Sequence, residues 1–275
     1  MKTILVPVDF SEKSEYAVKL ASQIAKKSDG VIHLLHMVEL PTGIVDMGAG
    51  SNFSIPESMM YLRKVKEKIV QLRETFFSEE SNVKHAIRFQ NPYEGITEYS
   101  AKINPDLIVM GSKGISDFEE ILIGSNTEKV VRTSKIPVIV VKKDAEKFKM
   151  KNIVFASNFK DESKESFSKL VEFANKFKSN IHLLKVNTID KFESSSASKE
   201  KIKDFLSEFK THKNTINVYN DVSVVKGIMN FSKEINADLI ALSTHGRSGL
   251  SHLFNGSITK NLSKNILRPL ITFKI

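Results

Sequence analysis

Lys2-Thr-Ile-Leu-Val-Pro-Val-Asp-Phe-Ser11 is the stretch that decides the fold, because a related stretch begins 149 residues later, Lys151-Asn-Ile-Val-Phe-Ala-Ser-Asn-Phe-Lys160. The same offset relates residues 32–36 (IHLLH) to 181–185 (IHLLK). Residues 104–108 (NPDLI) recur as 236–240 (NADLI), and 136–141 resemble 268–273. Solenoid repeats have periods of about 20–50 residues, so this long period indicates duplication of a whole domain. We predict two domains, residues 1–145 and 150–275.

Apolar segments of strand and helix type alternate within each copy. Residues 4–8 form a short buried-strand pattern, and Ser11 then suits the N-cap of an amphipathic helix. Further strands are expected at 31–38, 83–89, 107–110 and 136–141, and further helices at 57–78, 93–102 and from about 126. This alternation predicts an α/β fold of Rossmann-like type, with two tandem open parallel five-stranded sheets and helices on both faces.

Two segments have an irregular composition. Residues 42–56 are rich in Gly and Ser, and we expect a flexible excursion there, with a lid over a site as the alternative. Residues 190–201 of the second copy contain the run Ser-Ser-Ser-Ala-Ser, which we interpret as a surface loop.

Composition excludes several classes of protein. The chain has no Cys, which excludes a disulfide scaffold, a thiolate metal site and a thiol nucleophile. Its 41 Lys and Arg outnumber 32 Asp and Glu, but the lysines are spread along the chain, which favours a solvated basic surface without a nucleic-acid partner. No apolar run reaches the roughly 20 residues of a membrane span, and the N-terminus lacks the apolar core of a signal peptide. We therefore expect a cytoplasmic protein with no membrane partner.

A glycine-rich loop follows the fourth expected strand. It reads Gly111-Ser-Lys-Gly114, then nine residues, then Gly124-Ser125 at the start of a helix. Glycines let the backbone approach an anion closely, and the free N–H groups of a helix N-terminus favour a phosphate. The spacing differs from that of the Walker loop, and the position after the fourth strand differs from that of the dinucleotide fingerprint. The pattern predicts a phosphate site.

The pattern G-2x-G-9x-G-[S/T] resembles the signature of nucleotide-binding members of the universal stress protein (UspA) family. Val-Pro-Val-Asp9 at the first strand, the 106–114 segment and Ile-Pro-Val at the fifth strand are similar to that family too, and the resemblance covers nearly the whole chain. It implies a tandem stress-response protein that binds ATP or ADP in the first copy, with Mg²⁺. It also implies that the last strands of the copies pair across a pseudo-two-fold axis as an intramolecular pseudo-dimer, with further homodimerisation left open.

The resemblance assigns roles to residues by position. Asp9 would contact the ribose hydroxyls, and Pro7 and Val8 would shape an adenine pocket with Val38, whose backbone could bind the edge of the base. The residues expected around the ligand and its phosphates are Met110, Gly111, Gly114, Gly124, Ser125, Asn126 and Thr127.

The second copy departs from the pattern. Asn158 replaces the acidic residue, and Ser243 replaces the first glycine of the loop. We expect a weakened site, a site for another anion, or no ligand. The candidate residues of this second site are Asn158, Gly246, Gly256, Ser257 and Thr259.

Three functions fit these observations. The first is a nucleotide-binding regulator in which catalysis is incidental. The second is a slow ATP hydrolase, for which the loop offers no paired acidic motif, since Asp117, Glu119 and Glu120 suit a solvated loop. The third is a scaffold, or a lipid or metabolite binder, that uses the second domain. Catalytic residues and a metal site built from protein side chains are not predicted.

Overall fold

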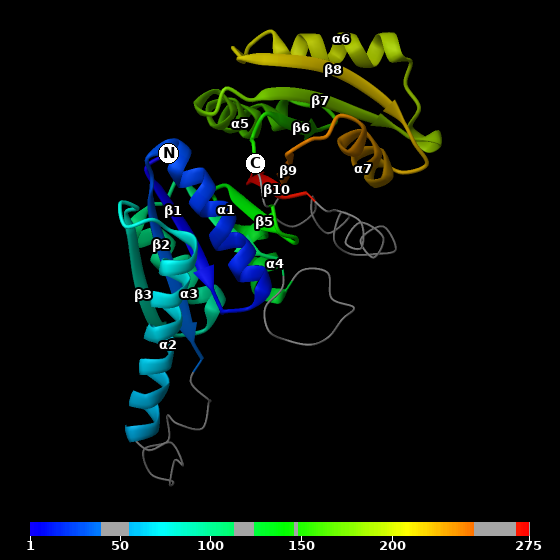
Figure 1. Ribbon diagram of the computed structural model, residues 1–275. Coiled ribbons are helices and arrows are strands. Elements are labelled where there is room, and N and C mark those ends of the chain that lie inside the picture. Colours follow the sequence, from blue (N-terminus) through cyan, green and yellow to red (C-terminus); the bar gives the residue numbers. More distant parts are fainter. Residues whose placement is uncertain (40–54, 113–123, 146–147, 245–267, 275) are drawn as a thin grey trace.

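Alternating strands and helices build two similar halves in the computed structural model, which describes residues 1–39, 55–112, 124–145, 148–244 and 268–274 (Figure 1). The first half consists of β1 (Thr3–Val8), α1 (Glu12–Ser28), β2 (Val31–Val38), α2 (Ile55–Phe76), β3 (Val83–Phe89), α3 (Pro92–Ile103), β4 (Leu107–Gly111), α4 (Ser125–Thr133) and β5 (Val138–Val141). The second half consists of β6 (Asn152–Ala156), the 3₁₀ turn η2 (Asp161–Ser163), α5 (Lys164–Lys176), β7 (Asn180–Asn187), η3 (Ile189–Lys191), α6 (Ser195–Leu206), β8 (Lys213–Asn220), α7 (Val224–Glu234), β9 (Leu239–Thr244) and β10 (Leu270–Lys274).

The strands of both halves form one ten-stranded sheet in the order β3-β2-β1-β4-β5-β10-β9-β6-β7-β8. Pairing is parallel within each half, as the alternation of strands and helices predicts. The chain builds outward from β1 to β3, and then returns to the other side of β1 for β4. The boundary between β1 and β4 is therefore a topological switch point, where open α/β sheets form a crevice at the carboxyl ends of their strands.

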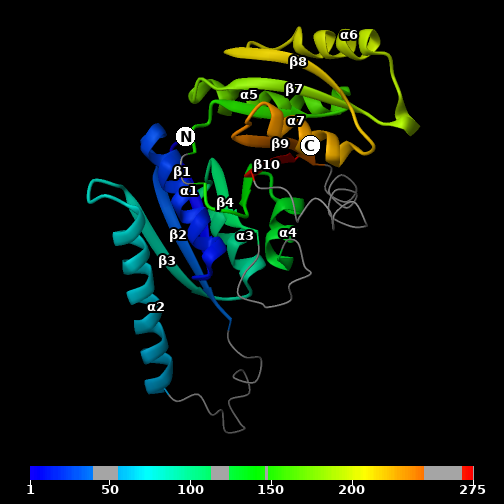
Figure 2. The same cartoon turned by 45° about the vertical axis from the view of Figure 1, so that its right-hand side comes forward.

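Helices cover both faces of the sheet, and the buried clusters show which face each one covers. Apolar residues of α1, α2, α5 and α6 belong to one cluster, which is continuous across the two halves. Helices α3 and α4 bury residues on the opposite face of the first half, and α7 does so in the second half. Figure 2 shows α2 and α4 on opposite sides of the first-half strands. None of the helices among the described residues combines the length and low charge that a bilayer-spanning segment needs.

The two halves are joined by antiparallel pairing of β5 with β10. Ile139 lies opposite Ile271 in this register, and both side chains are fully buried. The expected five-stranded sheets are thus continuous, and the halves form an intramolecular pseudo-dimer. The pairing covers two strand edges that would otherwise be open to other chains.

The connection between the halves packs along α1. Lys19 forms an ion pair with Asp144 at 2.6 Å. The Gln23 side chain donates to the carbonyl of Ala145 and accepts from the N–H of Phe148, each at 2.9 Å. The Phe148 side chain is buried in the shared cluster. These contacts fix the described part of the connection against the first half.

The loop prediction for residues 190–201 is wrong, because most of that segment lies in η3 and α6. Ser194 is the N-cap of α6, and its hydroxyl accepts from the N–H of Ala197 at 3.2 Å. Ser198, Ile202 and Phe205 follow at helical spacing and are buried. A serine run is a turn signal in isolation, but one serine before an apolar stripe of this spacing is also a helix start. The prediction for 42–56 falls mainly outside the described residues.

We predict that Ile271→Ala lowers the free energy of unfolding by about 2–5 kcal/mol, because it leaves a cavity at the junction of the halves. Urea unfolding followed by circular dichroism measures this change. Ile189→Ala is the matched control, since Ile189 is 91 % exposed and its truncation should change stability by less than about 0.5 kcal/mol. Equal effects of the two substitutions would contradict a packed junction.

Candidate functional site

A cavity of about 590 Å³ lies at the switch point of the first half, within the range of about 300–1,000 Å³ that is usual for small-molecule sites. The ends of β1, β2 and β4 form its floor, and α2, α3 and α4 contribute its walls. Nine residues that the sequence singles out line it: Pro7, Val8, Asp9, Met110, Gly111, Gly124, Ser125, Asn126 and Thr127. Val38 is buried and is not among the lining residues, whereas its neighbour Met37 is. Gly114 lies outside the described residues.

The N-terminus of α4 opens into this cavity. Its N-cap is Gly124, which makes no side-chain capping bond, so the first N–H groups of the helix are not satisfied by a cap. The Gly124 N–H donates to the carbonyl of Ser112 at 2.7 Å, which holds the two ends of the glycine loop together. The Thr127 hydroxyl donates to the carbonyl of Gly111 at 3.0 Å. This arrangement presents a positive helix end to the cavity, where it favours an anion.

Asp9 lies at the end of β1 with one carboxylate oxygen held in place. That oxygen, Oδ1, accepts from the N–H of Ser11 at 3.0 Å and from its hydroxyl at 2.6 Å. Within the described part of the chain, Oδ2 has no hydrogen-bond partner. A carboxylate with one fixed oxygen and one available oxygen can accept hydrogen bonds from ligand hydroxyl groups.

Gly111 allows the end of β4 to touch the first turn of α1. A Cβ atom at this position would lie 2.7 Å from the carbonyl carbon and oxygen of Lys13 and 2.9 Å from the nitrogen of Ser14. Only glycine fits so close to backbone atoms. The glycine therefore shapes the floor of the cavity, whatever its additional role toward a ligand.

The sequence reasoning missed the wall that α2 contributes and the side chains after β1 and on β2. The signal on α2 was available, because Tyr61, Lys64, Val65 and Lys68 have the i, i+3, i+4, i+7 spacing of one helical face. No comparable signal existed for residues that only the fold brings together. The lining residues missed are Phe10, Ser14, Leu35, His36, Met37, Glu39, Tyr61, Lys64, Val65, Lys68, Pro92 and Ile96.

His36 is a buried polar side chain in this lining. Its Nδ1 lies 2.8 Å from the carbonyl oxygen of Val8, which can only accept, so Nδ1 carries the proton. Its Nε2 is buried, and none of the residues that the structure describes forms a hydrogen bond with it. Burial lowers the pKa of His36, and Lys68 adds to this, while the Val8 carbonyl and Asp9 oppose it. The net lowering favours the neutral ring at pH 7, with Nε2 as an unused acceptor.

The second half has different side chains at the equivalent positions. Asn158 corresponds to Asp9, and its Oδ1 accepts from the N–H of Lys160 at 3.2 Å. Ser243 corresponds to Gly111, and its hydroxyl hydrogen-bonds that of Ser166 on α5. The helix that corresponds to α1 begins here with the 3₁₀ turn η2. Gly246, Gly256, Ser257 and Thr259 lie outside the described residues, so of the second candidate site only Asn158 is placed.

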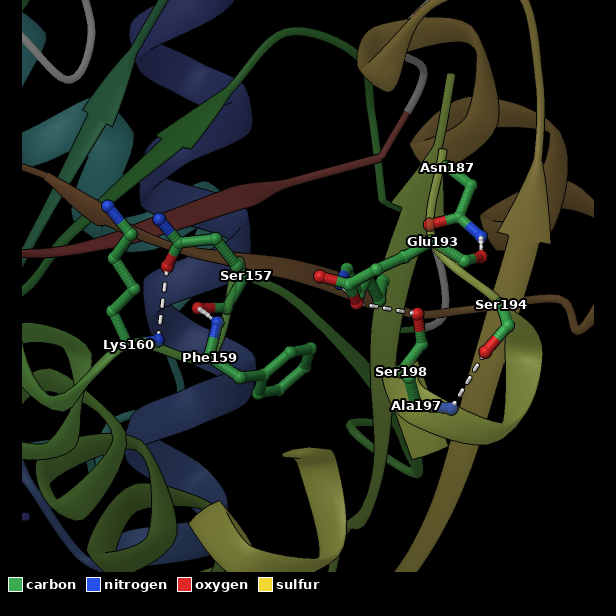
Figure 3. A network of polar contacts seen from close by, with 10 residues as sticks. Ser157, Phe159, Lys160, Asn187, Glu193, Ser194, Ala197 and Ser198 are labelled. Carbon is green, nitrogen blue, oxygen red and sulfur yellow. Dashed lines mark hydrogen bonds and ion pairs between the residues drawn. The ribbon is translucent and has the colours of Figure 1, made fainter. Parts of the chain in front are cut away.

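An internal ion pair occupies the position that His36 has in the first half. The 149-residue offset and the strand registers make Lys185 its counterpart, and its ammonium pairs with Glu193 in the connection from β7 to α6. The Ser198 hydroxyl donates to the same carboxylate at 3.0 Å, and the Asn187 amide donates to the backbone carbonyl of Glu193 at 2.8 Å (Figure 3). These contacts hold the β7–α6 connection against the end of β7.

The fold and the position of the cavity are typical of doubly wound α/β domains, and the chain contains two such domains in tandem. The universal stress protein family model matches residues 1–142 and 149–274. The chain therefore belongs to the universal stress protein family, with two copies of its domain.

Known proteins of the family resemble either one half or the whole chain. Universal stress protein MJ0531 of Methanocaldococcus jannaschii is 33% identical, with 52% of this chain and 82% of that protein aligned. Universal stress protein G of Escherichia coli O157:H7 is 31% identical, with 51% of this chain and 99% of that protein aligned. The crystal structure of a universal stress protein from Archaeoglobus fulgidus matches 99% of this chain and 96% of its own, with a TM-score of 0.71 at 21% identity. This last similarity shows the shared fold.

We predict that Glu193→Gln destabilises the protein by on the order of 1–2 kcal/mol at pH 7, because it leaves the nearly buried Lys185 ammonium without its counter-charge. Lys185 lowers the pKa of Glu193, so the pair contributes stability above the unfolded carboxyl pKa of about 4.3 and loses it as pH falls through the lower folded pKa. Thermal unfolding from pH 7 to pH 3 should show the difference between variant and parent shrinking.

Glu165→Gln is the control for this substitution, because Glu165 pairs with Lys169 on an exposed helix face. Its removal should leave the melting temperature unchanged within error. If the Glu193→Gln protein had the same melting temperature as the control at pH 7, the Lys185–Glu193 pair would have no structural role.

Proposed function

We propose that the first half binds an adenine nucleotide, ATP or ADP, and that the protein is a nucleotide-dependent regulator in a stress response. The observation that carries this proposal is the cavity itself, in which a free helix N-terminus and an available carboxylate oxygen face the same space. Membership of the universal stress protein family supports the regulatory part. The proposal includes a cytoplasmic location and two units, residues 1–145 and 150–275.

The phosphate groups would lie at the N-terminus of α4. The backbone N–H groups of Ser125, Asn126 and Thr127 are the first of that helix, and the dipole adds positive potential. Gly111 would support this site indirectly, because its missing side chain lets α1 pack against the end of β4 at the floor of the cavity. Gly114 belongs to this proposal on its sequence position alone. Mg²⁺ would be bound mainly through the phosphate oxygens of the nucleotide, as is usual for this ion.

The nucleoside would extend from Asp9 across the strand ends. The available Oδ2 of Asp9 would accept from a ribose hydroxyl, while Oδ1 stays with Ser11. The base would lie in the apolar part of the cavity, which Pro7, Val8, Met37, Pro92 and Ile96 line. Met37 lines the cavity where Val38 does not, so we assign the backbone contact to the base to Met37.

Bound nucleotide would act by mass action on the folded state. A ligand at 100 times its dissociation constant stabilises the protein that binds it by about 2.7 kcal/mol. The bound nucleotide would also favour the conformation of the cavity walls that fits it best. The surface available to a partner protein would change with that conformation. No catalytic step is needed for this function.

The test is the nucleotide content of protein purified under native conditions, released by denaturation and identified by chromatography and mass spectrometry. We predict about one ATP or ADP per chain, and loss of it in the double variant Asp9→Ala with Gly124→Val. The backbone at Gly124 has a conformation that valine readily adopts, and we expect its branched side chain to block the helix end. Asn158→Ala is the control at the equivalent position of the second half, and it should retain the nucleotide.

Absence of bound nucleotide, together with no thermal shift on adding Mg-ATP, would overturn the proposal. About two nucleotides per chain would show that the second half binds one as well, despite Asn158 and Ser243.

A further inference from the structure

One face of α2 lines the cavity with side chains to which the proposed nucleotide site assigns no role. Tyr61, Lys64, Val65 and Lys68 belong to this face. Val65 is 3 % exposed and anchors the helix to the core, whereas the other three carry polar ends and are exposed. Two ammonium groups and a phenol hydroxyl are all hydrogen-bond donors. This wall therefore suits a negatively charged group.

Lys64 and Lys68 have no carboxylate partner among the residues that the structure describes. On the same helix, Arg63 and Glu67 do pair, at 3.2 Å, so the helix satisfies a neighbouring cation and leaves these two unpaired. Like charges four residues apart on a helix repel each other. An anion between them would turn that repulsion into attraction.

A second, independent observation lies beneath the lysines. The Lys68 ammonium lies 5.2 Å from the centre of the Phe10 ring, and that ring lies 4.6 Å from the His36 ring. His36 is 5 % exposed, and its Nε2 has no hydrogen-bond partner in the described part of the chain. Because this nitrogen is an acceptor, the group still to be supplied at this end of the cavity is a hydrogen-bond donor of a ligand, such as a hydroxyl or an N–H, while the lysines above it suit the negative charge.

The second half shows how the same fold neutralises a cation at this place. Lys185, in the position of His36, is paired there with Glu193 of its own chain. Helix α6 corresponds to α2, because its buried residues Ser198, Ile202 and Phe205 repeat the spacing of Val65, Ile69 and Leu72. By that correspondence Ala197 stands where α2 has Lys64, and Lys201 stands where it has Lys68, so the second half lacks only the first of the two cations. The first half has His36 in place of Lys185, and the part of its chain that corresponds to the connection with Glu193 lies outside the described residues.

Two acidic residues share the cavity and limit where an anion can lie. Asp9 has one oxygen engaged by Ser11, and Glu39 is an exposed residue at the end of β2. Helix α4 packs on one face of the sheet and α2 on the other, with Asp9 at the strand end between them. An anion at the lysines is therefore distinct from one at the α4 N-terminus, and the ribose position lies between the two.

We propose that Lys64 and Lys68 form a second anion subsite that takes a phosphoryl group carried by a ribose hydroxyl. The ligand class is an adenine nucleotide phosphorylated on both sides of its ribose, with the 5′-phosphate at α4 and the 2′- or 3′-phosphate at α2. This inference rests on the proposed function, because it uses the same cavity and the same orientation of the nucleoside.

Isomeric ligands separate the two subsites. Calorimetric titration of the full chain, freed of bound nucleotide, compares AMP with adenosine 3′,5′-bisphosphate, adenosine 2′,5′-bisphosphate and ADP. We expect at least one bisphosphate isomer to bind about tenfold more tightly than AMP, the gain that one charge-assisted contact supplies. In the double variant Lys64→Ala with Lys68→Ala, the ratio of bisphosphate to AMP affinity should fall to about one. Lys66→Ala is the matched control, since Lys66 is exposed on the same helix and does not line the cavity, so the parent ratio should persist.

Equal affinities of the parent protein for AMP and both bisphosphates would overturn the subsite and leave the proposed function standing. A double variant that keeps the parent ratio, or a Lys66→Ala protein that loses it as fully, would also overturn the subsite. Failure of all four ligands and of ATP to bind would instead overturn the proposed function, and the subsite with it.

Discussion

The antiparallel pairing of β5 with β10 is the contact on which the rest of this structure depends. It closes two strand edges at once and places Ile139 against Ile271 in a fully buried position. It also makes the strands of the two halves run in opposite directions. Because crevices form at the carboxyl ends of parallel strands, the two halves present theirs at opposite edges of the shared sheet. The core on one face is nevertheless continuous, and Phe148 of the connection belongs to it.

Sharing a core lets one half preserve a site while the other changes. The first half keeps Gly111 where the end of β4 meets α1, and its cavity has polar walls. The second half places a serine there and begins the adjoining helix with a 3₁₀ turn. At the end of β7 the second half has the Lys185–Glu193 ion pair, and hydrogen bonds hold the short β7–α6 connection against this strand end. One fold thus carries a polar cavity in one copy and an internally neutralised charge in the other.

The fold was predictable because its signals are local and repeated. Short apolar runs, helix caps such as Ser11 and the 149-residue offset each reflect the physics of neighbouring residues, and the resemblance to a known family agreed with them. The start of α4 at Ser125 was predictable for the same reason, since a helix start after a strand is a local pattern. The helix at 195–206 was missed because its serine run satisfies both a turn and an N-cap. Only burial of Ile202 and Phe205 against the rest of the core decides between them.

The sequence by itself determined the alternation of strands and helices, the duplication, and nine of the residues around the cavity. Tertiary structure decided the rest, because it depends on pairs of residues far apart in the chain. Which residues of β2 line the cavity depends on where the strand runs past β1 and the neighbouring helices, since Leu35, His36 and Met37 line it although they alternate between the two faces of the sheet, and Val38 does not. The wall of Lys64 and Lys68 exists only because α2 packs beside the end of β1. The contact of His36 is also tertiary, because the sheet brings the carbonyl of Val8 to Nδ1, while no described residue reaches Nε2.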